Sequence, residues 1–278
     1  MKKQGVNKLL NKKLIIPVVA VLLTVCLIVT AVVISLNHHS DIYKMVDKAI
    51  ENSESKSQFY LGFETTTSVS KGDKSYKTDT GGVIFSANNM EDAVVSINAV
   101  STTPDNTSSD YNVTATFYCD GDNVYDITTG KEVKASISTK EFKDILDEYS
   151  LYMYEEKHAT NAVFNENQLE EFKGSGEVTV TLSSPGDEIL EEYAVVISEL
   201  TGENVKKSDL KVKAAFVSYV IYDELVQSQT YTFSVEYVPE DGEKVDYTVS
   251  SFVSFSDDFE NVEEYDQYKA FLIEEDKL

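Results

Sequence analysis

The side chains that most often carry out enzymatic chemistry are scarce in this sequence and form no familiar motif. Beyond residue 36 the chain has one cysteine, Cys119, and three histidines, His38, His39 and His158. No sequence cue pairs Cys119 with a histidine, and every basic residue is a lysine, so the arginine that a sortase-like transpeptidase needs is missing. There is no G-x-S-x-G, zinc spacing or phosphate loop. We therefore expect a protein that is not an enzyme and uses no cofactor.

Two acidic stretches invite comparison with metal sites. Residues 120–123 begin like a calcium-binding loop, but Val124 occupies the fifth position and Lys131 stands where the closing glutamate belongs. Residues 256–266 are rich in carboxylates without a fixed spacing. We interpret the first as a β-turn and the second as a solvated terminus, and we expect no metal.

Aromatic residues are the remaining chemical resource. The chain has 17 tyrosines and 13 phenylalanines but no tryptophan. They cluster on predicted strands, where the simpler interpretation is a packed sheet core with tyrosine on the other face. The alternative is that one face of a curved sheet, covered by helices, lines an apolar ligand cavity. The candidate lining residues are Phe59, Leu61, Phe63, Phe85, Phe117, Phe216, Tyr219, Phe233 and Phe252.

The elements that position these residues follow from hydrophobic periodicity in the first half of the chain. Helical spacing over 41–52 precedes an alternating strand that begins at Phe59, a turn at 71–74 and a return strand with Gly81-Gly82 as a bulge or bend. Further strands and turns are predicted over 92–102, 111–119, 123–128 and 129–136.

The second half begins with a helix over 139–150, capped by Ser138-Thr139. Residues 150–174 are predicted to be mostly helical or irregular. A strand over 177–184, a helix that opens at Ser184 or Asp187, and long strands over 209–223, 229–239 and 244–256 follow. Segments 64–86 and 233–256 resemble each other, which a duplicated helix-then-meander unit or the general likeness of antiparallel hairpins would explain. The fold class is α+β.

The N-terminal region sets the location. Leu14 to Leu36 is uncharged and, at ~1.5 Å per residue, long enough to cross a ~30 Å hydrocarbon core. Residues 1–13 carry lysines and no acid, which predicts a cytoplasmic N-terminus and an extracellular C-terminal domain. Two alternatives are a lipidated Cys26, which Val25 disfavours, and a cleaved signal ending near residues 31 or 35.

The charge limits which classes of partner can bind, and the cysteine content indicates the compartment. The net charge is −24, and all acidic residues lie beyond the membrane segment. This field repels phosphates, so no nucleic-acid partner is expected. One cysteine in the exported part leaves no internal disulfide, which is typical of a bacterial cell surface rather than an animal extracellular space.

Several segments together resemble a known group. The entry over 41–66 resembles the start of uncharacterised Gram-positive lipoproteins, and 117–142 resembles their strand–turn–strand–helix segment. The residues that carry the second match are Tyr118, Gly121, Val124, Tyr125, Gly130, Lys131, Val133 and Lys134. The group is similar to the LolA, LppX and LprG lipid-carrier superfamily. That resemblance covers most of 41–256 and implies a curved antiparallel half-barrel closed by helices over an apolar cavity. This chain has a membrane helix where those relatives carry a lipidated cysteine.

The combined prediction is a single-pass cell-membrane protein. It has a basic cytoplasmic tail (1–13), a transmembrane helix (14–36), an extracellular LolA/LppX-like domain (37–258) and an acidic tail (259–278). The domain is expected to bind an apolar or lipid ligand without catalysis. The alternative is an envelope interaction or sensing module with a solid core, in which case a protein partner takes the place of the ligand.

Overall fold

The computed structural model describes most of the predicted extracellular domain. The described residues are 40–87, 92–102, 111–128, 133–134, 137–148, 151–240 and 242–258. The predicted cytoplasmic tail, transmembrane helix and acidic C-terminal tail lie outside them. Among the described helices, none combines the length and apolar character needed to cross a membrane. The chain divides into two units between Lys44 and Met45, and the description below is of the second.

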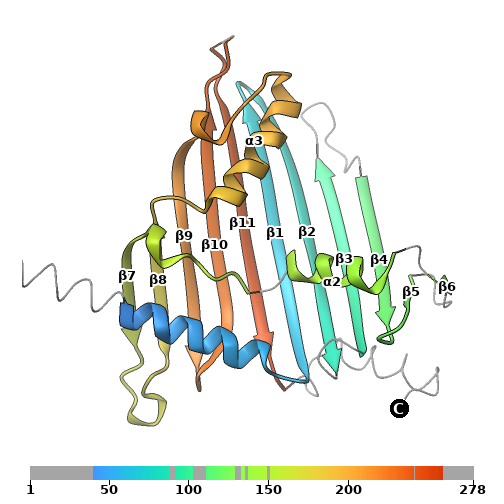
Figure 1. The fold of residues 1–278 in the computed structure, drawn as a ribbon, viewed down its shortest axis with the longest axis vertical. Coiled ribbons are helices and arrows are strands. Elements are labelled where there is room, and N and C mark those ends of the chain that lie inside the picture. Colours follow the sequence, from blue (N-terminus) through green and yellow to red (C-terminus); the bar gives the residue numbers. More distant parts are fainter. Residues whose placement is uncertain are drawn as a thin grey trace, which may run out of the picture. The chain divides into compact units, whose positions relative to one another are not determined.

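One eleven-stranded sheet forms the frame of this unit (Figure 1). Its order is β6-β5-β4-β3-β2-β1-β11-β10-β9-β8-β7, and neighbouring strands are antiparallel throughout. The strands are β1 (Phe59–Lys71), β2 (Lys74–Ala87), β3 (Asp92–Thr102), β4 (Tyr111–Cys119), β5 (Val124–Asp126), β6 (Val133–Lys134), β7 (Ala159–Glu166), β8 (Gly176–Leu182), β9 (Lys211–Tyr222), β10 (Leu225–Tyr237) and β11 (Val245–Ser256). The first and last strands of the chain order, β1 and β11, pair at the centre.

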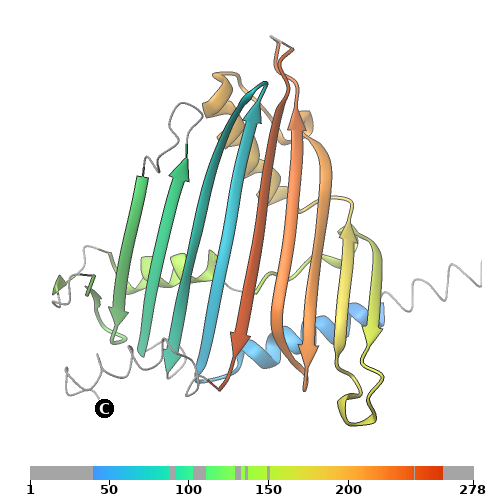
Figure 2. The same ribbon diagram turned by 180° about the vertical axis from the view of Figure 1, so that it is seen from behind.

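The helices lie on one face of the sheet. They are residues 45–54 of the first helix, α2 (Thr139–Glu148) and α3 (Asp187–Thr201). Short 3₁₀ turns are η1 (Glu156–His158), η2 (Glu170–Phe172) and η3 (Lys207–Asp209). Figure 1 shows α2 and α3 in front of the strands, and Figure 2, from behind, shows the strands in front of them. We call the covered side the helix face and the other side the open face.

The main core lies on the helix face. Because side chains alternate between faces, the odd-numbered residues of β1 and β11 share this side with those of 215–221 in β9 and 229–235 in β10. Tyr219, Phe233 and Val253 from three of these strands are at most 2 % exposed. Tyr193 of α3 packs edge-on against Tyr247 of β11, with ring centroids 4.6 Å apart. Burial of these aromatic groups is the chief stabilising contribution in a domain without disulfides.

Local capping sets the start of α2, as predicted, and the end of α3. At the start of α2, the Ser138 amide donates to Glu141 Oε2 (2.7 Å) and the Glu141 amide donates to Ser138 Oγ (3.2 Å), which is a capping box. α3 ends at Gly202, whose φ of 75° is the left-handed conformation that favours glycine. The predicted helices at 41–52 and 139–150, the helix from Asp187 and the α+β class are confirmed.

One prediction about local structure is incomplete and another is wrong. Residues 150–174 were expected to be mostly helical or irregular, but residues 159–166 form β7, because half-buried Ala162 and Phe164 alternate with exposed side chains against β8. Gly81-Gly82 was expected to form a bulge or bend, yet β2 pairs with β1 and β3 without a register shift there. The shifts occur instead at Val226/Ser228 and Ser234/Val235 in β10 and near Ala159 in β7.

Candidate functional site

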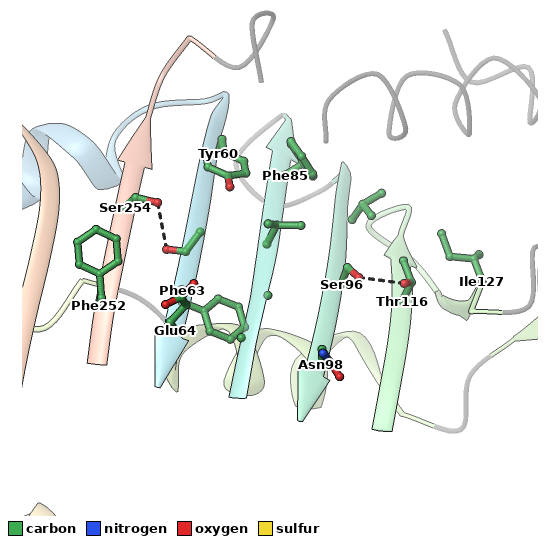
Figure 3. A pocket seen from close by; sticks show the side chains of 15 residues that line it. Tyr60, Phe63, Glu64, Phe85, Ser96, Asn98, Thr116, Ile127, Phe252 and Ser254 are labelled. Carbon is green, nitrogen blue, oxygen red and sulfur yellow. Dashed lines mark hydrogen bonds between the residues drawn. The ribbon is translucent and has the colours of Figure 1, made fainter. Parts of the chain in front are cut away.

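The open face carries a hollow of about 580 Å³ over the middle of β11, β1, β2, β3 and β4 (Figure 3). Three neighbouring rows of side chains build it, and each row runs across four or five of these strands. The register of the sheet sets the rows, since directly paired residues project from the same face.

The first row is an aromatic wall. Tyr60 pairs with Phe85, Phe85 with Val94, and Val94 with Tyr118. The rings of Tyr60 and Phe85 are 5.2 Å apart, and those of Tyr118 and Tyr125 are 6.3 Å apart. Phe85 and Tyr118 are each 2 % exposed. The sheet thus has a second, smaller apolar cluster on the side that α2 and α3 leave uncovered.

The second row is the floor and consists of smaller side chains. It runs Ser254, Gly62, Val83, Ser96 and Thr116 across the five strands. The Ser254 hydroxyl lies 3.4 Å from the Gly62 carbonyl oxygen, and the hydroxyls of Ser96 and Thr116 are 3.2 Å apart (Figure 3). Because these side chains are short, this row forms the bottom of the hollow, and it offers hydroxyl groups beside the aromatic wall.

The third row is the opposite rim, which is more polar. Phe252 pairs with Glu64, Glu64 with Gly81, and Gly81 with Asn98. Phe252 is 44 % exposed. One rim of the hollow thus holds an exposed ring, a carboxylate and an amide, whereas the other is an aromatic wall. This arrangement suits a ligand that is apolar along one side and polar along the other.

The adjacent glycines have different roles. A Cβ on Gly81 would meet nothing closer than the Phe63 carbonyl oxygen at 3.5 Å, so the open space there is part of the hollow. A Cβ on Gly82 would lie 2.2 Å from the Ser96 carbonyl oxygen and 2.7 Å from Cζ of Phe63. Gly82 is required by the packing of the Phe63 ring on the helix face, and Gly81 keeps the open face hollow.

The structure divides the predicted lining residues between the two faces. Phe85, Phe216 and Phe252 project from the open face, whereas the other predicted residues lie on the helix face. These are Phe59, Leu61, Phe63, Phe117, Tyr219 and Phe233. Phe63, Phe85 and Phe252 border the hollow, although the ring of Phe63 belongs to the helix face. The nine residues therefore do not line one common cavity.

Sequence reasoning missed the other residues that line the hollow. Tyr60, Gly62 and Gly81 were assigned to strands without a functional role, and Ser96 and Thr116 attracted no attention. One feature of the sequence could have indicated the hollow. In both β1 and β2 a glycine, Gly62 or Gly81, stands at a position on the face opposite to the buried apolar residues, where a larger side chain would fill the space. Which rows these glycines join depends on the β1–β2–β3 register, which the sequence does not contain.

Of the residues considered for catalysis and metal binding, those that the structure describes form no metal-ligand cluster, and His38, His39 and 259–266 lie outside the described residues. Cys119 is a fully buried thiol. Within the described part of the chain, no group of three or more His, Cys, Asp or Glu side chains could hold a metal ion. Asp120 accepts bonds from the amides of Asp122 and Asn123 at 3.0 and 2.7 Å, as in a β-turn.

The strongest electrostatic feature of the open face lies away from the hollow, on β9, β10 and β11. Glu236 is 13 % exposed and forms ion pairs with Lys213 and Lys244 at 3.0 Å each, and with Lys211 at 3.6 Å. The hydrogen bond from Lys213, followed by that from Lys244, lowers the pKa of Glu236 to about 2. Glu236 and the three lysines therefore form a salt-bridge network at this end of the sheet.

Comparisons with known proteins yield structural likenesses only. No family model matches the sequence, and no curated protein matches it. LprF from Mycobacterium bovis aligns over 78 % of this chain and 92 % of its own, at 11 % identity and a TM-score of 0.35. A DUF1329 family protein from Desulfovibrio piger aligns over 80 % and 91 %, at 7 % identity and a TM-score of 0.21.

An acyl-ACP thioesterase from Bacteroides thetaiotaomicron aligns over 76 % of this chain and 83 % of its own, at 10 % identity and a TM-score of 0.16. All three TM-scores lie below 0.5, so these likenesses support no inference about the function of this chain.

Proposed function

We propose that the chain is a membrane-tethered cell-envelope domain that binds an apolar or lipid ligand without catalysis, and that the ligand lies in the hollow of the open face. The observation that carries the proposal is the alignment of three rows across β11, β1, β2, β3 and β4, with an aromatic wall, a hydroxyl-bearing floor and a polar rim. The sequence supports the tether through Leu14–Leu36.

The geometry of the hollow indicates how a ligand would be held. Apolar groups would lie against the half-buried ring of Tyr60, where burial contributes about 25 cal/mol per Å², and Phe85, which is 2 % exposed, would support that ring from beside it. Polar groups would face Glu64 and Asn98 on the opposite rim. An amphiphile satisfies both sides, which is why a lipid is the preferred class. In this proposal the half-barrel implied by the LolA, LppX and LprG resemblance uses its open face, not a cavity beneath the helices.

A photoactivatable lipid tests the proposal. The full chain is reconstituted into vesicles that contain a diazirine-bearing phospholipid, illuminated and digested, and labelled peptides are identified by mass spectrometry. We expect labels in peptides with Tyr60, Phe85 or Phe252. Gly81→Leu adds a side chain toward the hollow, with its Cβ 3.5 Å from the nearest backbone atom, and should lower that labelling at least fivefold. Labelling of residues 14–36 serves as the internal control and should stay unchanged.

A second function is favoured by the packing of the helix face. Tyr154, Tyr219 and Phe233 are at most 1 % exposed, as in a solid core. A module with such a core, using exposed open-face residues such as Phe216 and Tyr222, would serve envelope interaction or sensing without a small ligand. Absence of label from every open-face peptide, with normal labelling of 14–36, would reject the lipid proposal in favour of this one.

A further inference from the structure

The two edges of the sheet differ in how they are protected. Edge strands expose unpaired backbone groups, and natural proteins blunt them with short strands, lysine, proline or bulges. β6 is two residues long and ends in Lys134. β7 is eight residues long, contains neither lysine nor proline, and is uncharged until its last residue, Glu166. Among the described strands none pairs with β7 on its outer side, because β7 is the last strand of the order.

The hydrogen-bond pattern identifies which backbone groups of β7 point outward. The Asn167 amide donates to the Ser175 carbonyl (2.6 Å), and the pairing with β8 continues in the same register back to Asn161. Because inward and outward groups alternate along an antiparallel ladder, Asn161, Val163 and Asn165 bond to β8. The amides and carbonyls of Ala162, Phe164 and Glu166 therefore point away from the sheet.

The side chains of β7 also suit a strand added at this edge. Val163 is 43 % exposed and lies on the open face between Asn161 and Asn165. Phe164 lies on the other face, over Gly176, where an added Cβ would approach the Phe164 ring within 2.7 Å. A strand beside β7 would thus cover an exposed valine and meet amide side chains without burying a charge.

We propose that β7 is a self-association edge, on which β7 of a second copy of this chain pairs antiparallel about a two-fold axis. Charge favours a second copy here, because in a protein of net charge −24 the uncharged edge lets two copies approach without opposing carboxylates. A two-fold axis also makes the edge complementary to itself.

The outward groups define the register of this pair. Ala162 bonds to Phe164 of the partner subunit, and Val163 meets Val163 of the partner subunit as a non-hydrogen-bonded pair with Cβ atoms ~5 Å apart. Asn161 then lies opposite Asn165 of the partner subunit. The interface joins the two open faces into one surface and leaves the hollow uninvolved, so it stands independently of the lipid proposal.

Cysteine cross-linking tests this register. In the full chain carrying Cys26→Ala, purified in detergent, Val163→Cys should form a disulfide-linked dimer under mild oxidation. The matched control is Asn165→Cys, because two residues at position 165 are ~13 Å apart in this register, at ~3.3 Å per residue. We expect at least tenfold more cross-linked dimer for Val163→Cys. Equal cross-linking of both variants, or of neither, overturns the proposed pairing.

Sedimentation of the full chain in detergent provides the second measurement. Ala162→Pro removes an outward amide and leaves the bonds to β8 in place, so it should weaken dimerisation at least tenfold, whereas Ala162→Ser should not. Added salt should strengthen the wild-type dimer, because it screens the repulsion between two acidic chains. If the proline variant unfolds, Val163→Lys, which opposes two like charges, takes its place. A wild-type monomer, or a dimer that these variants leave unchanged, overturns the proposal, and so does capture of another protein's strand by monomeric β7.

Discussion

The buried side chain of Gln229 binds both backbone groups of Tyr152. Its Oε1 accepts a hydrogen bond from the Tyr152 amide (2.7 Å), and its Nε2 donates to the Tyr152 carbonyl (2.6 Å). The hydroxyl of Tyr219 donates to the same carbonyl (2.7 Å). Gln229 is 1 % exposed. The side-chain amide of Gln229 thus satisfies the backbone N–H and C=O of Tyr152, as a neighbouring strand would. It thereby fixes the segment that precedes β7 on the helix face.

Replacing Gln229 by leucine should therefore destabilise the domain. The Tyr152 amide would lose its partner in a partly buried position, which costs about 1–3 kcal/mol, and the carbonyl would keep only Tyr219. We expect a loss of about 2–3 kcal/mol in urea denaturation. Thr232→Ala, which removes a hydroxyl pair with Ser250 on the open face, is the control and should cost under about 0.5 kcal/mol. Equal losses for the two variants would contradict this role of Gln229.

The two neighbouring glycines of β2 should respond differently to alanine. Gly82→Ala forces Cβ to within 2.2 Å of the Ser96 carbonyl oxygen, and overpacking of this kind costs about 1–3 kcal/mol. Gly81→Ala meets no atom closer than 3.5 Å and should change stability by less than about 0.5 kcal/mol. Thermal unfolding of both variants checks the difference. A stable Gly82→Ala protein would mean that β2 and β3 pair differently.

Glu236 should make the domain sensitive to acid. Its pKa is lowered to about 2 by Lys213 and Lys244, from an ordinary value of 4.5. A depressed pKa stabilises the folded state above the unfolded value, and that contribution is lost as pH falls from about 4.5 toward 2. Glu236→Gln should thus be less stable than wild type at pH 6, and the difference should disappear near pH 2. Glu199→Gln, at an exposed position of α3, should show no such convergence.

Alkali should act through the buried tyrosines. Burial, with a smaller contribution from the Glu155 charge, raises the pKa of Tyr152 to about 12, and burial likewise raises the pKa of Tyr231. These groups stay neutral in the folded state while an unfolded chain ionises near pH 10, so stability should fall as pH rises from about 10 to 12. Absorbance at 295 nm should show one exposed tyrosine population titrating first. A second population, the buried tyrosines, should titrate only when the protein unfolds. Titration of all tyrosines in a single step before unfolding would contradict the protection of Tyr152 and Tyr231 by burial.

The cap of α2 can be tested alone. Ser138→Ala removes the hydroxyl that accepts from the Glu141 amide and should cost about 1 kcal/mol. Faster hydrogen exchange in the first turn of α2, without a change in β9 or β10, would report the local effect. Ser138→Asp preserves an acceptor and should restore protection, whereas equal exchange in all three proteins would exclude the cap as a stabilising element.

The local sequence pattern was sufficient to predict most of the helices and strands. The alternation from Phe59, the helical spacing before it, Ser138 as a cap and Gly202 as a terminator are all encoded within a few residues. A period of two or of 3.6 is a property of neighbouring positions, so it can be read without knowledge of the fold. β7 escaped because its apolar and polar residues do not alternate with a period of two, and its identity depends on pairing with β8.

The sequence by itself determined the helices, every strand except β7, the uncharged segment at 14–36 and the absence of a catalytic motif. Only the tertiary structure decided which face of the sheet the helices cover, and hence that Phe85 and Phe252 lie opposite Tyr219 and Phe233. Alternation places residues on two faces but does not say which face is buried, because that depends on long-range pairing such as β1 with β11. The same pairing aligns Gly62, Val83 and Ser96 into one row and so creates the hollow.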